Sequence, residues 1–366
     1  MKKRVIYYIS ILFFITGLAA FKADNFIVLP DEPLPFKPHG YYIAAVTDDR
    51  PAKSPVAQVV TLSADKKTAV QSADLQGGTL SAVRGYISRN LDKDASQRPV
   101  IVSIKEFKLT ETSLPGNRVD GQVKLVLSFG LQKDYGFERL VDYRGGLHYI
   151  RPVSNSALAA TQLRDCLKNG ITYFNNWMKA NTGTNIKLAQ KVTFKFTDYA
   201  EPNENDTVYY SPKRPLVWDD FRATTPPSGP YAAMVIPAFG YDEQHEVVNG
   251  AIRVKLSMKV YLAKSASWVS GGGQTSYALN HEQRHFDITR IIARQFQQKV
   301  LNAGLTPDTW EAFIGMQYLD SYRDMHAMQT AYDSETAHGR NHSAQAEWNR
   351  RIDKLLGEGA DTGLSR

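Results

Sequence analysis

Residues 278–288 read Ala-Leu-Asn-His-Glu-Gln-Arg-His-Phe-Asp-Ile, and this stretch decides how the rest of the chain is interpreted. It places His281 and His285 four residues apart, with Glu282 directly after the first histidine. On a helix, residues four apart project from one face, so both imidazoles can bind one metal ion. In metallopeptidases this His-Glu-x-x-His pattern binds zinc, and the glutamate acts as general base on water. The stretch therefore predicts a helix with His281 and His285 as Zn²⁺ ligands and Glu282 as a catalytic residue.

The sequence before this helix predicts antiparallel strands. Asn249-Gly250 is typical of a hairpin turn, and apolar residues then alternate strictly with polar ones over residues 252–260. Thr275 or Ser276 is the expected N-cap of the helix. A hairpin and edge strand ahead of a zinc helix is the arrangement in which peptidases bind a substrate backbone by strand addition.

Long helices are expected after these strands. The helix with the two histidines should run from about residue 277 to 301 and end before a break at 303–305. Thr306-Pro307 then predicts the start of a second long helix, which should stop near Gly339. A short final helix is expected over residues 344–356.

A catalytic zinc site needs three protein ligands, so one more ligand must follow the two histidines. Glu335 and His338 lie three residues apart near the end of the second helix and share one face. We expect Glu335 to be the third zinc ligand and His338, or alternatively Tyr332, to stabilise the oxyanion. His338 is the next candidate for the ligand, followed by Asp333 and His326.

The helix register favours other residues. If the two helices form a straight hairpin about the break near residue 304, residue 325 lies level with Gln283, which favours Asp324 or His326 as the ligand. A kink at Gly315, or a turn back near the helix end, would bring Glu335 into place instead. Asp287 is a candidate partner of the ligand histidines, although it lies only two residues after His285 and so points elsewhere on a regular helix.

The first half of the chain predicts a small α+β domain of unknown role over residues 24–185. A Pro-rich extended segment opens it, and helices and strands follow; the helices are expected over 78–91 and 155–180, and the strands over 100–107, 122–129 and 146–150. Small polar residues at 181–185 predict a linker, and a strand at 192–197 opens a second domain over 190–366. His39 and His148 are isolated, so no catalytic site is expected in the first half.

Residues 1–23 have the layout of a signal peptide or an N-terminal anchor. Lys2-Lys3-Arg4 precedes an uncharged apolar run over 5–20 that ends in small residues. The predicted location is therefore the periplasm or the exterior, with membrane attachment only through an uncleaved N-terminal segment. The net charge of +7 includes no other basic run, so nucleic acid is not an expected partner. Cys166 is the single cysteine and cannot form an intramolecular disulfide.

Several of these motifs together resemble the bacterial family called domain of unknown function 922. The resemblance covers about residues 211–356 and rests on four spaced motifs: His281-Glu282-Gln283-x-His285-Phe286-Asp287-Ile288, Pro215-Leu216-x-Trp218-x-Asp220-Phe221, Ser267-Trp268 and Tyr332-Asp333-x-x-Thr336-x-His338-Gly339. It implies a zincin-like fold for the second domain and membership among secreted zinc-dependent proteases. Glu335-x-x-His338-Gly339 is also similar in spacing to the Asp-x-x-Tyr-Gly element of deuterolysin-like metallopeptidases, in which the acid ligates zinc and the tyrosine stabilises the transition state.

The sequence thus predicts an α+β protein that is an exported zinc-dependent peptidase, a hydrolase of peptides or proteins in the cell envelope. The alternative is a non-catalytic envelope protein that binds or scaffolds other molecules and keeps zinc in a degenerate zincin domain. Such a protein would still need the two histidines, but not Glu282.

Overall fold

The computed structural model describes residues 26–53, 55–63, 65, 67–199, 205–224 and 231–358. The predicted signal peptide or anchor at 1–23 lies outside these residues. The chain divides into two compact units, Met1–Lys179 and Ala180–Arg366, and the division falls next to the predicted linker. Sheets and helices occur in both units, so the mixed α and β composition is confirmed. Among the described residues, no helix combines the length and apolar character needed to cross a membrane.

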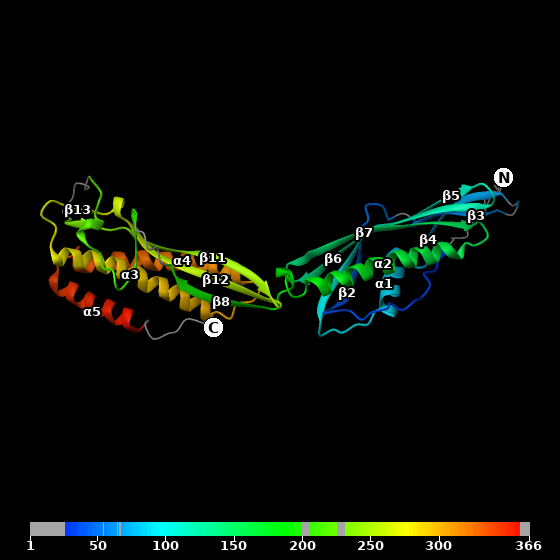
Figure 1. The fold of residues 1–366 in the computed structure, drawn as a ribbon. Coiled ribbons are helices and arrows are strands. Elements are labelled where there is room, and N and C mark those ends of the chain that lie inside the picture. Colours follow the sequence, from blue (N-terminus) through cyan, green and yellow to red (C-terminus); the bar gives the residue numbers. More distant parts are fainter. Residues whose placement is uncertain are drawn as a thin grey trace, which may run out of the picture. The chain divides into compact units, whose positions relative to one another are not determined.

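The first unit is built on a seven-stranded sheet in the order β1-β4-β3-β5-β6-β7, with β2 paired to β5. The strands are β1 (Phe26–Ile27), β2 (Tyr41–Asp48), β3 (Ala57–Leu62), β4 (Thr68–Leu75), β5 (Arg98–Leu114), β6 (Arg118–Lys133) and β7 (Gly136–Pro152). Two helices, α1 (Thr79–Asn90) and α2 (Ala157–Asn181), complete the unit (Figure 1). Phe174 of α2 stacks on Phe129 of β6 with ring centroids 4.2 Å apart, which places α2 against one face of the sheet.

The two helices of this unit and its three long strands lie where the sequence predicts them, although the strands are longer than expected. The sequence reading missed β2, β3 and β4. In β2, which pairs in parallel with β5, most residues are only partly buried, so no two-residue alternation marks it. Because the segment before β2 is rich in proline, the whole region was expected to be extended chain without regular strands.

The second unit has a sheet in the order β11-β12-β8, with β9 paired to β12. Its strands are β8 (Lys191–Asp198), β9 (Thr207–Tyr209), β11 (Pro237–Val248) and β12 (Ala251–Ala263), and β10 (Ala233–Met234) pairs separately with β13 (Trp268–Val269). Asn249 and Gly250 both adopt positive φ, 52° and 72°, as the predicted hairpin turn between β11 and β12 requires. The alternation over 252–260 is confirmed, since its apolar members are buried in the core of this unit.

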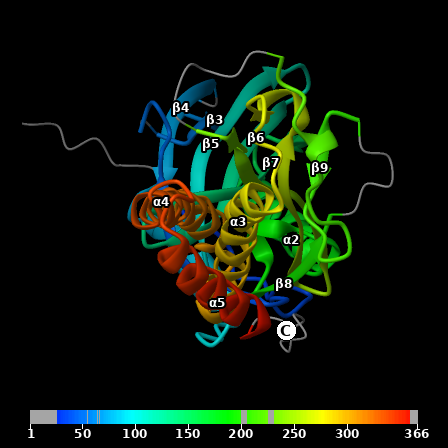
Figure 2. The ribbon, with the colours of Figure 1, turned by 90° about the vertical axis from the view of Figure 1, so that its left-hand side faces the viewer.

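Three helices pack together in this unit: α3 (Ser276–Asn302), α4 (Trp310–Thr336) and α5 (His342–Glu358). Figure 2 shows them as neighbours. The predicted cap of α3 is confirmed, because Thr275 Oγ1 accepts a hydrogen bond from the Ala278 amide at 3.1 Å. Buried residues of α3 and α4, among them Phe286, Phe296 and Trp310, join those of the sheet in one core.

The start of α4 differs from the prediction and changes the register of the hairpin. Residues 307–309 form a turn and the helix begins only at Trp310, so the hairpin pivots later than residue 304. As a result His285 faces Gln329, and the Tyr332 hydroxyl donates to the His281 carbonyl at 3.2 Å. The expectation that residue 325 lies level with Gln283 is therefore wrong by about one and a half helical turns.

Candidate metal centre

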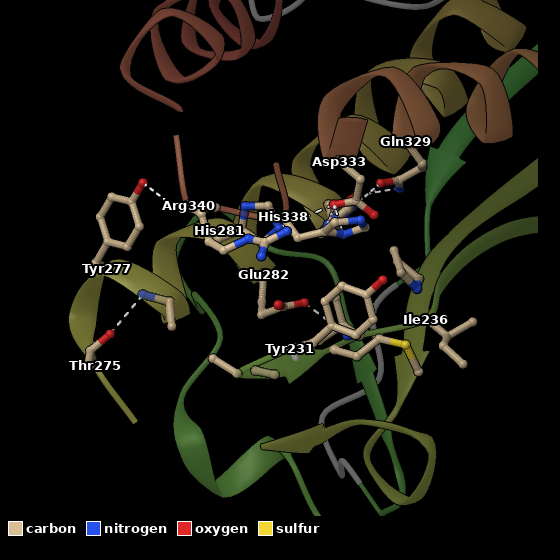
Figure 3. A pocket seen from close by; sticks show the side chains of 18 of the residues that line it. Tyr231, Ile236, Thr275, Tyr277, His281, Glu282, Gln329, Asp333, His338 and Arg340 are labelled. Carbon is tan, nitrogen blue, oxygen red and sulfur yellow. Dashed lines mark hydrogen bonds and ion pairs between the residues drawn. The ribbon is translucent and has the colours of Figure 1, made fainter. Parts of the chain in front are cut away.

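Two histidines of α3 and one aspartate of α4 converge at one point. One ligand atom from each of His281, His285 and Asp333 lies within 4.8 Å of the others, and this is the only such group of His, Cys, Asp or Glu in the described part of the chain. Asp333 Oδ1 lies 3.3 Å from His281 Nε2 and 3.0 Å from His285 Nε2 (Figure 3). The site therefore joins α3 to α4 through side chains that are all at least partly buried.

Two glutamines fix the orientation of the imidazoles. His281 Nδ1 lies 2.8 Å from Gln345 Oε1, and His285 Nδ1 contacts Gln329 Oε1. The Gln329 amide nitrogen donates to the His285 carbonyl at 2.9 Å; because a carbonyl only accepts, this assigns the Gln329 oxygen to the ring. The Gln345 amide nitrogen donates to Asn349 Oδ1 at 3.0 Å, which leaves its oxygen for His281. Each histidine thus carries its hydrogen on Nδ1.

This tautomer leaves a lone pair on each Nε2, and both lone pairs point at a carboxylate oxygen. Asp333 Oδ1 is buried and accepts no hydrogen bond, so three acceptors face one another without a donor between them. Such an arrangement needs a positive charge at its centre. Two imidazole nitrogens and one carboxylate oxygen are the ligand atoms that Zn²⁺ takes in catalytic sites, and ligand histidines characteristically donate their other nitrogen to an acceptor. The residues present therefore fit a zinc ion.

The protonation behaviour of the cluster reflects the same need for positive charge. Burial alone would raise the pKa of Asp333, but the two imidazoles hold it well below its usual range. Burial opposes protonation of His285, yet the Asp333 and Glu282 carboxylates outweigh burial and raise the pKa of this histidine. Either a proton on an imidazole or a metal ion would supply the positive charge that the Asp333 carboxylate lacks.

Glu282 lies beside the cluster on α3 and is only 4% exposed. Its Oε2 accepts a hydrogen bond from the Val235 amide, just after β10, at 3.0 Å. Burial raises the pKa of Glu282, and the neighbouring histidines counteract part of that effect. A carboxylate with a raised pKa, held next to a candidate metal site, accepts a proton more readily than a solvated carboxylate, as a general base must.

His338 is held at the site by a left-handed turn. Ala337, His338 and Gly339 have φ values of 49°, 54° and 78°, in a region that residues other than glycine rarely adopt. The turn places His338 Nδ1 3.6 Å from Asp333 Oδ1 and its ring 4.5 Å from the Tyr231 ring. Gly339 approaches His281 closely, since a Cβ there would lie 3.4 Å from the imidazole. The backbone strain thus brings a third imidazole to the edge of the cluster.

A cavity of about 500 Å³ opens beside these residues. Figure 3 shows the cluster and Glu282 on one side of it and Tyr231 and Ile236 on the other. Residues 231–237 form one wall, and the start of α3, the second half of α4 and the turn after α4 supply the rest. The size is sufficient for a few residues of a peptide or a comparable small molecule.

The prediction of Glu335 as third ligand is not met by this geometry. Glu335 is exposed, and its Oε2 accepts a hydrogen bond from Trp348 Nε1 at 2.8 Å. Two residues along a helix correspond to a rotation of about 200°, so Glu335 points away from the face that carries Asp333. Asp333, a later choice in the sequence analysis, occupies the place expected for Glu335.

The other candidates also receive definite positions. Asp324 pairs with Lys299 at 3.0 Å on the surface, away from the cluster. His326 lines the cavity but contacts the Tyr322 ring rather than the ligand atoms. Tyr332 is fully buried, and because its hydroxyl already donates to the His281 carbonyl it cannot serve an oxyanion in the cavity.

Asp287 points away from the metal ligands, as a regular helix dictates. It accepts hydrogen bonds from the Tyr210 hydroxyl and the Gln283 amide, both at 3.0 Å. Gln283 Oε1 in turn accepts from the Leu216 amide at 2.8 Å. The far face of α3 is thus bound to the segment that contains the Pro-Leu-x-Trp-x-Asp-Phe motif, and Asp287 positions this segment rather than a ligand histidine.

Gln329, Gln345, Tyr231 and Arg340 are the residues at this site that the sequence analysis missed. Gln329 precedes Asp333 by four residues and so lies on the same face of α4, which is a signal that helical spacing could have supplied. Nothing in a single sequence distinguishes Gln345, which lies on another helix, from any other glutamine.

Comparisons with known proteins assign no family to the chain. No family model and no curated protein matches it. Among solved structures, a Xanthomonas campestris protein of the DUF330 family is similar at 12% identity and a TM-score of 0.28, covering 43% of this chain and 98% of its own. A minor lipoprotein from Acinetobacter baumannii is similar at 12% identity and a TM-score of 0.20, covering 27% of this chain and 80% of its own. Both likenesses are too weak to carry a conclusion, and the resemblance to domain of unknown function 922 stays a prediction.

Proposed function

We propose that the second unit is a zinc-dependent peptidase with a zincin-like fold. One observation carries the proposal: two imidazole lone pairs and the Asp333 carboxylate converge without a donor, directly beside a buried glutamate. The His-Glu-x-x-His helix, the β-strands before it and the cavity beside it support the same function.

In this proposal His281, His285 and Asp333 hold the zinc ion. When bound, the ion would supply the positive charge that acidifies water and polarises a peptide carbonyl. Gln329 and Gln345 keep both imidazoles in the tautomer that offers Nε2 as a ligand atom. These glutamines hold the ligand geometry in place before the ion binds.

Glu282 and His338 perform the proton transfer and the charge stabilisation. Glu282 would accept the proton of the attacking water and deliver it to the leaving amine, for which its raised pKa is suited. The Val235 amide holds one oxygen of Glu282 at 3.0 Å and so fixes the direction of the carboxylate. His338, at the edge of the cluster, would donate a hydrogen bond to the oxyanion.

The proposed place of action is the cell envelope or the exterior. The basic start and apolar run of residues 1–20 support export of the chain. The substrates would then be peptides or proteins outside the cytoplasm.

The test compares the wild type with Glu282→Gln in two assays, zinc content by mass spectrometry and cleavage of casein and a peptide library. We expect both proteins to carry about one zinc ion per chain and the variant to cleave about 10²- to 10⁴-fold more slowly, the usual contribution of a general base. The matched control is Glu347→Gln on the surface of α5, which should change neither assay.

Two results would contradict the proposal. A wild type purified without chelators that contains no zinc would remove the metal site altogether. Full zinc content with no cleavage by the wild type would instead favour the non-catalytic binding protein.

A further inference from the structure

Arg340 is a cation on the wall of the cavity. Its Nε donates to the Ala337 carbonyl at 3.0 Å, and the side chain lines the cavity beside His338 (Figure 3). Within the described ranges no carboxylate forms an ion pair with it. A guanidinium has five N–H donors, so the bond to Ala337 leaves both terminal nitrogens available for a ligand.

The two carboxylates that line the cavity already have partners other than Arg340. Glu282 accepts from the Val235 amide, and Asp333 faces both ligand histidines. With zinc bound, the two carboxylates balance the charge of the divalent ion, and the two imidazoles are neutral. Arg340 therefore makes the occupied site positive. A bound substrate is therefore favoured if it brings a negative charge to this side of the cavity.

The backbone fixes where this charge is presented. Arg340 directly follows the left-handed turn at 337–339, and the Tyr277 hydroxyl donates to the Gly339 carbonyl at 2.7 Å. The Nε bond to Ala337 further limits the side chain to one direction. A guanidinium held in this way can bind a carboxylate through two parallel hydrogen bonds.

The wall formed by residues 231–237 adds an apolar surface. It includes Met234 and Ile236, the latter 56% exposed, and Met325 of α4 extends it. An exposed apolar side chain beside a metal cluster is suited to contact an apolar group of a ligand. The cavity thus combines an apolar wall with a cation, Arg340, that forms no ion pair with any described carboxylate.

We propose that Arg340 binds a carboxylate of the substrate and makes the enzyme selective for peptides that carry one next to an apolar residue. The carboxylate is either the free C-terminus or an aspartate or glutamate side chain. This inference rests on the proposed function, because it names the substrate class of the same site. It makes Arg340 a specificity-determining residue.

The experiment measures peptide binding by calorimetry, using zinc-loaded Glu282→Gln protein so that the ligand is not consumed. Three probes share one sequence rich in leucine and phenylalanine: a free C-terminal acid, its C-terminal amide, and the amide with one internal aspartate. Each probe is titrated into the Glu282→Gln protein and into double variants that also carry Arg340→Gln, Arg340→Lys or Arg350→Gln. Arg350→Gln is the control, because it removes an exposed charge on α5.

We expect one acidic probe to bind about tenfold more tightly than the neutral amide, the effect of a charged hydrogen-bonded pair open to solvent. Arg340→Gln should abolish this difference, Arg340→Lys should retain part of it, and Arg350→Gln should leave it unchanged. The acidic probe that gains affinity identifies the source of the carboxylate.

Equal binding of all three probes, selectivity that survives Arg340→Gln, or no binding of any probe at millimolar concentration would each overturn the inference. These results are distinct from failure of the proposed function. Cleavage without acid selectivity rejects only the role of Arg340, whereas acid-selective binding without cleavage by the wild type rejects only the peptidase.

Discussion

Replacement of Asp333 by asparagine separates the ligand set proposed from the geometry from the one expected from the sequence. The substitution keeps the size of the side chain and removes the negative charge that faces both Nε2 atoms at 3.0 and 3.3 Å. Zinc binding to a four-ligand structural site is worth about 10–16 kcal/mol, or about 2.5–4 kcal/mol for each ligand. Loss of one ligand should therefore weaken zinc binding about 10²- to 10³-fold.

The assay is competition for zinc against a chromogenic chelator, with the dissociation constant followed for the wild type, Asp333→Asn and Glu335→Gln. Glu335→Gln is the matched control, because it removes the same charge two residues away and disturbs only the hydrogen bond with Trp348. It should leave the zinc affinity within about threefold of the wild type. If Glu335→Gln loses zinc while Asp333→Asn keeps it, the ligand assignment made from the geometry is refuted.

Two further substitutions test a contact of the candidate site and a buried ion pair elsewhere in the second unit. Gln345→Leu keeps a side chain of similar size but removes the acceptor of His281 Nδ1. Zinc binding should weaken about 10- to 100-fold in the same competition assay. An unchanged affinity would show that the tautomer of His281 needs no such partner. Asp220, buried and bound by Arg214 at 2.6 Å, has two opposing influences on its pKa: burial raises it, and Arg214 prevails and lowers it. The ionised form is thus favoured on folding, so its stabilisation is present above about pH 4 and is lost as the pH falls through the lowered pKa. Asp220→Asn should cost about 2 kcal/mol in urea unfolding at pH 7 and less at pH 3, and an equal loss at both pH values would contradict this origin.

The sequence was sufficient for the features set by local periodicity. The histidine helix, its Thr275 cap and the Asn249-Gly250 hairpin follow from spacing and turn chemistry within a few residues, and all three are present. The third ligand depends instead on the register between two helices, which shifts because α4 begins at Trp310 rather than after Thr306. The three-residue turn before α4 begins with a proline, and such a turn is hard to distinguish from a helix start in the sequence. This difference was enough to favour the wrong carboxylate.

Features that depend on distant contacts could not be predicted in this way. Strand β2 is stabilised by parallel pairing with β5, about 55 residues further along the chain, and its own sequence carries no clear alternation. The orientation of His281 depends on Gln345 from α5, a contact between residues separated by 64 positions. Such contacts follow from packing between elements. A single sequence contains no local pattern that identifies either partner.

The glutamines that hold the two imidazoles would also determine when the proposed zinc ion is acquired. Both rings are oriented by Gln329 and Gln345, and the Tyr332 ring packs on both, so the contacts that orient the rings are all made by protein groups. Many small zinc domains, by contrast, remain unfolded until the metal binds. A chain built in this way can fold first and be loaded afterwards, and chelation followed by resupply would return it to the same state without refolding. Under the proposed export of the chain, synthesis and metal loading can therefore take place in different compartments.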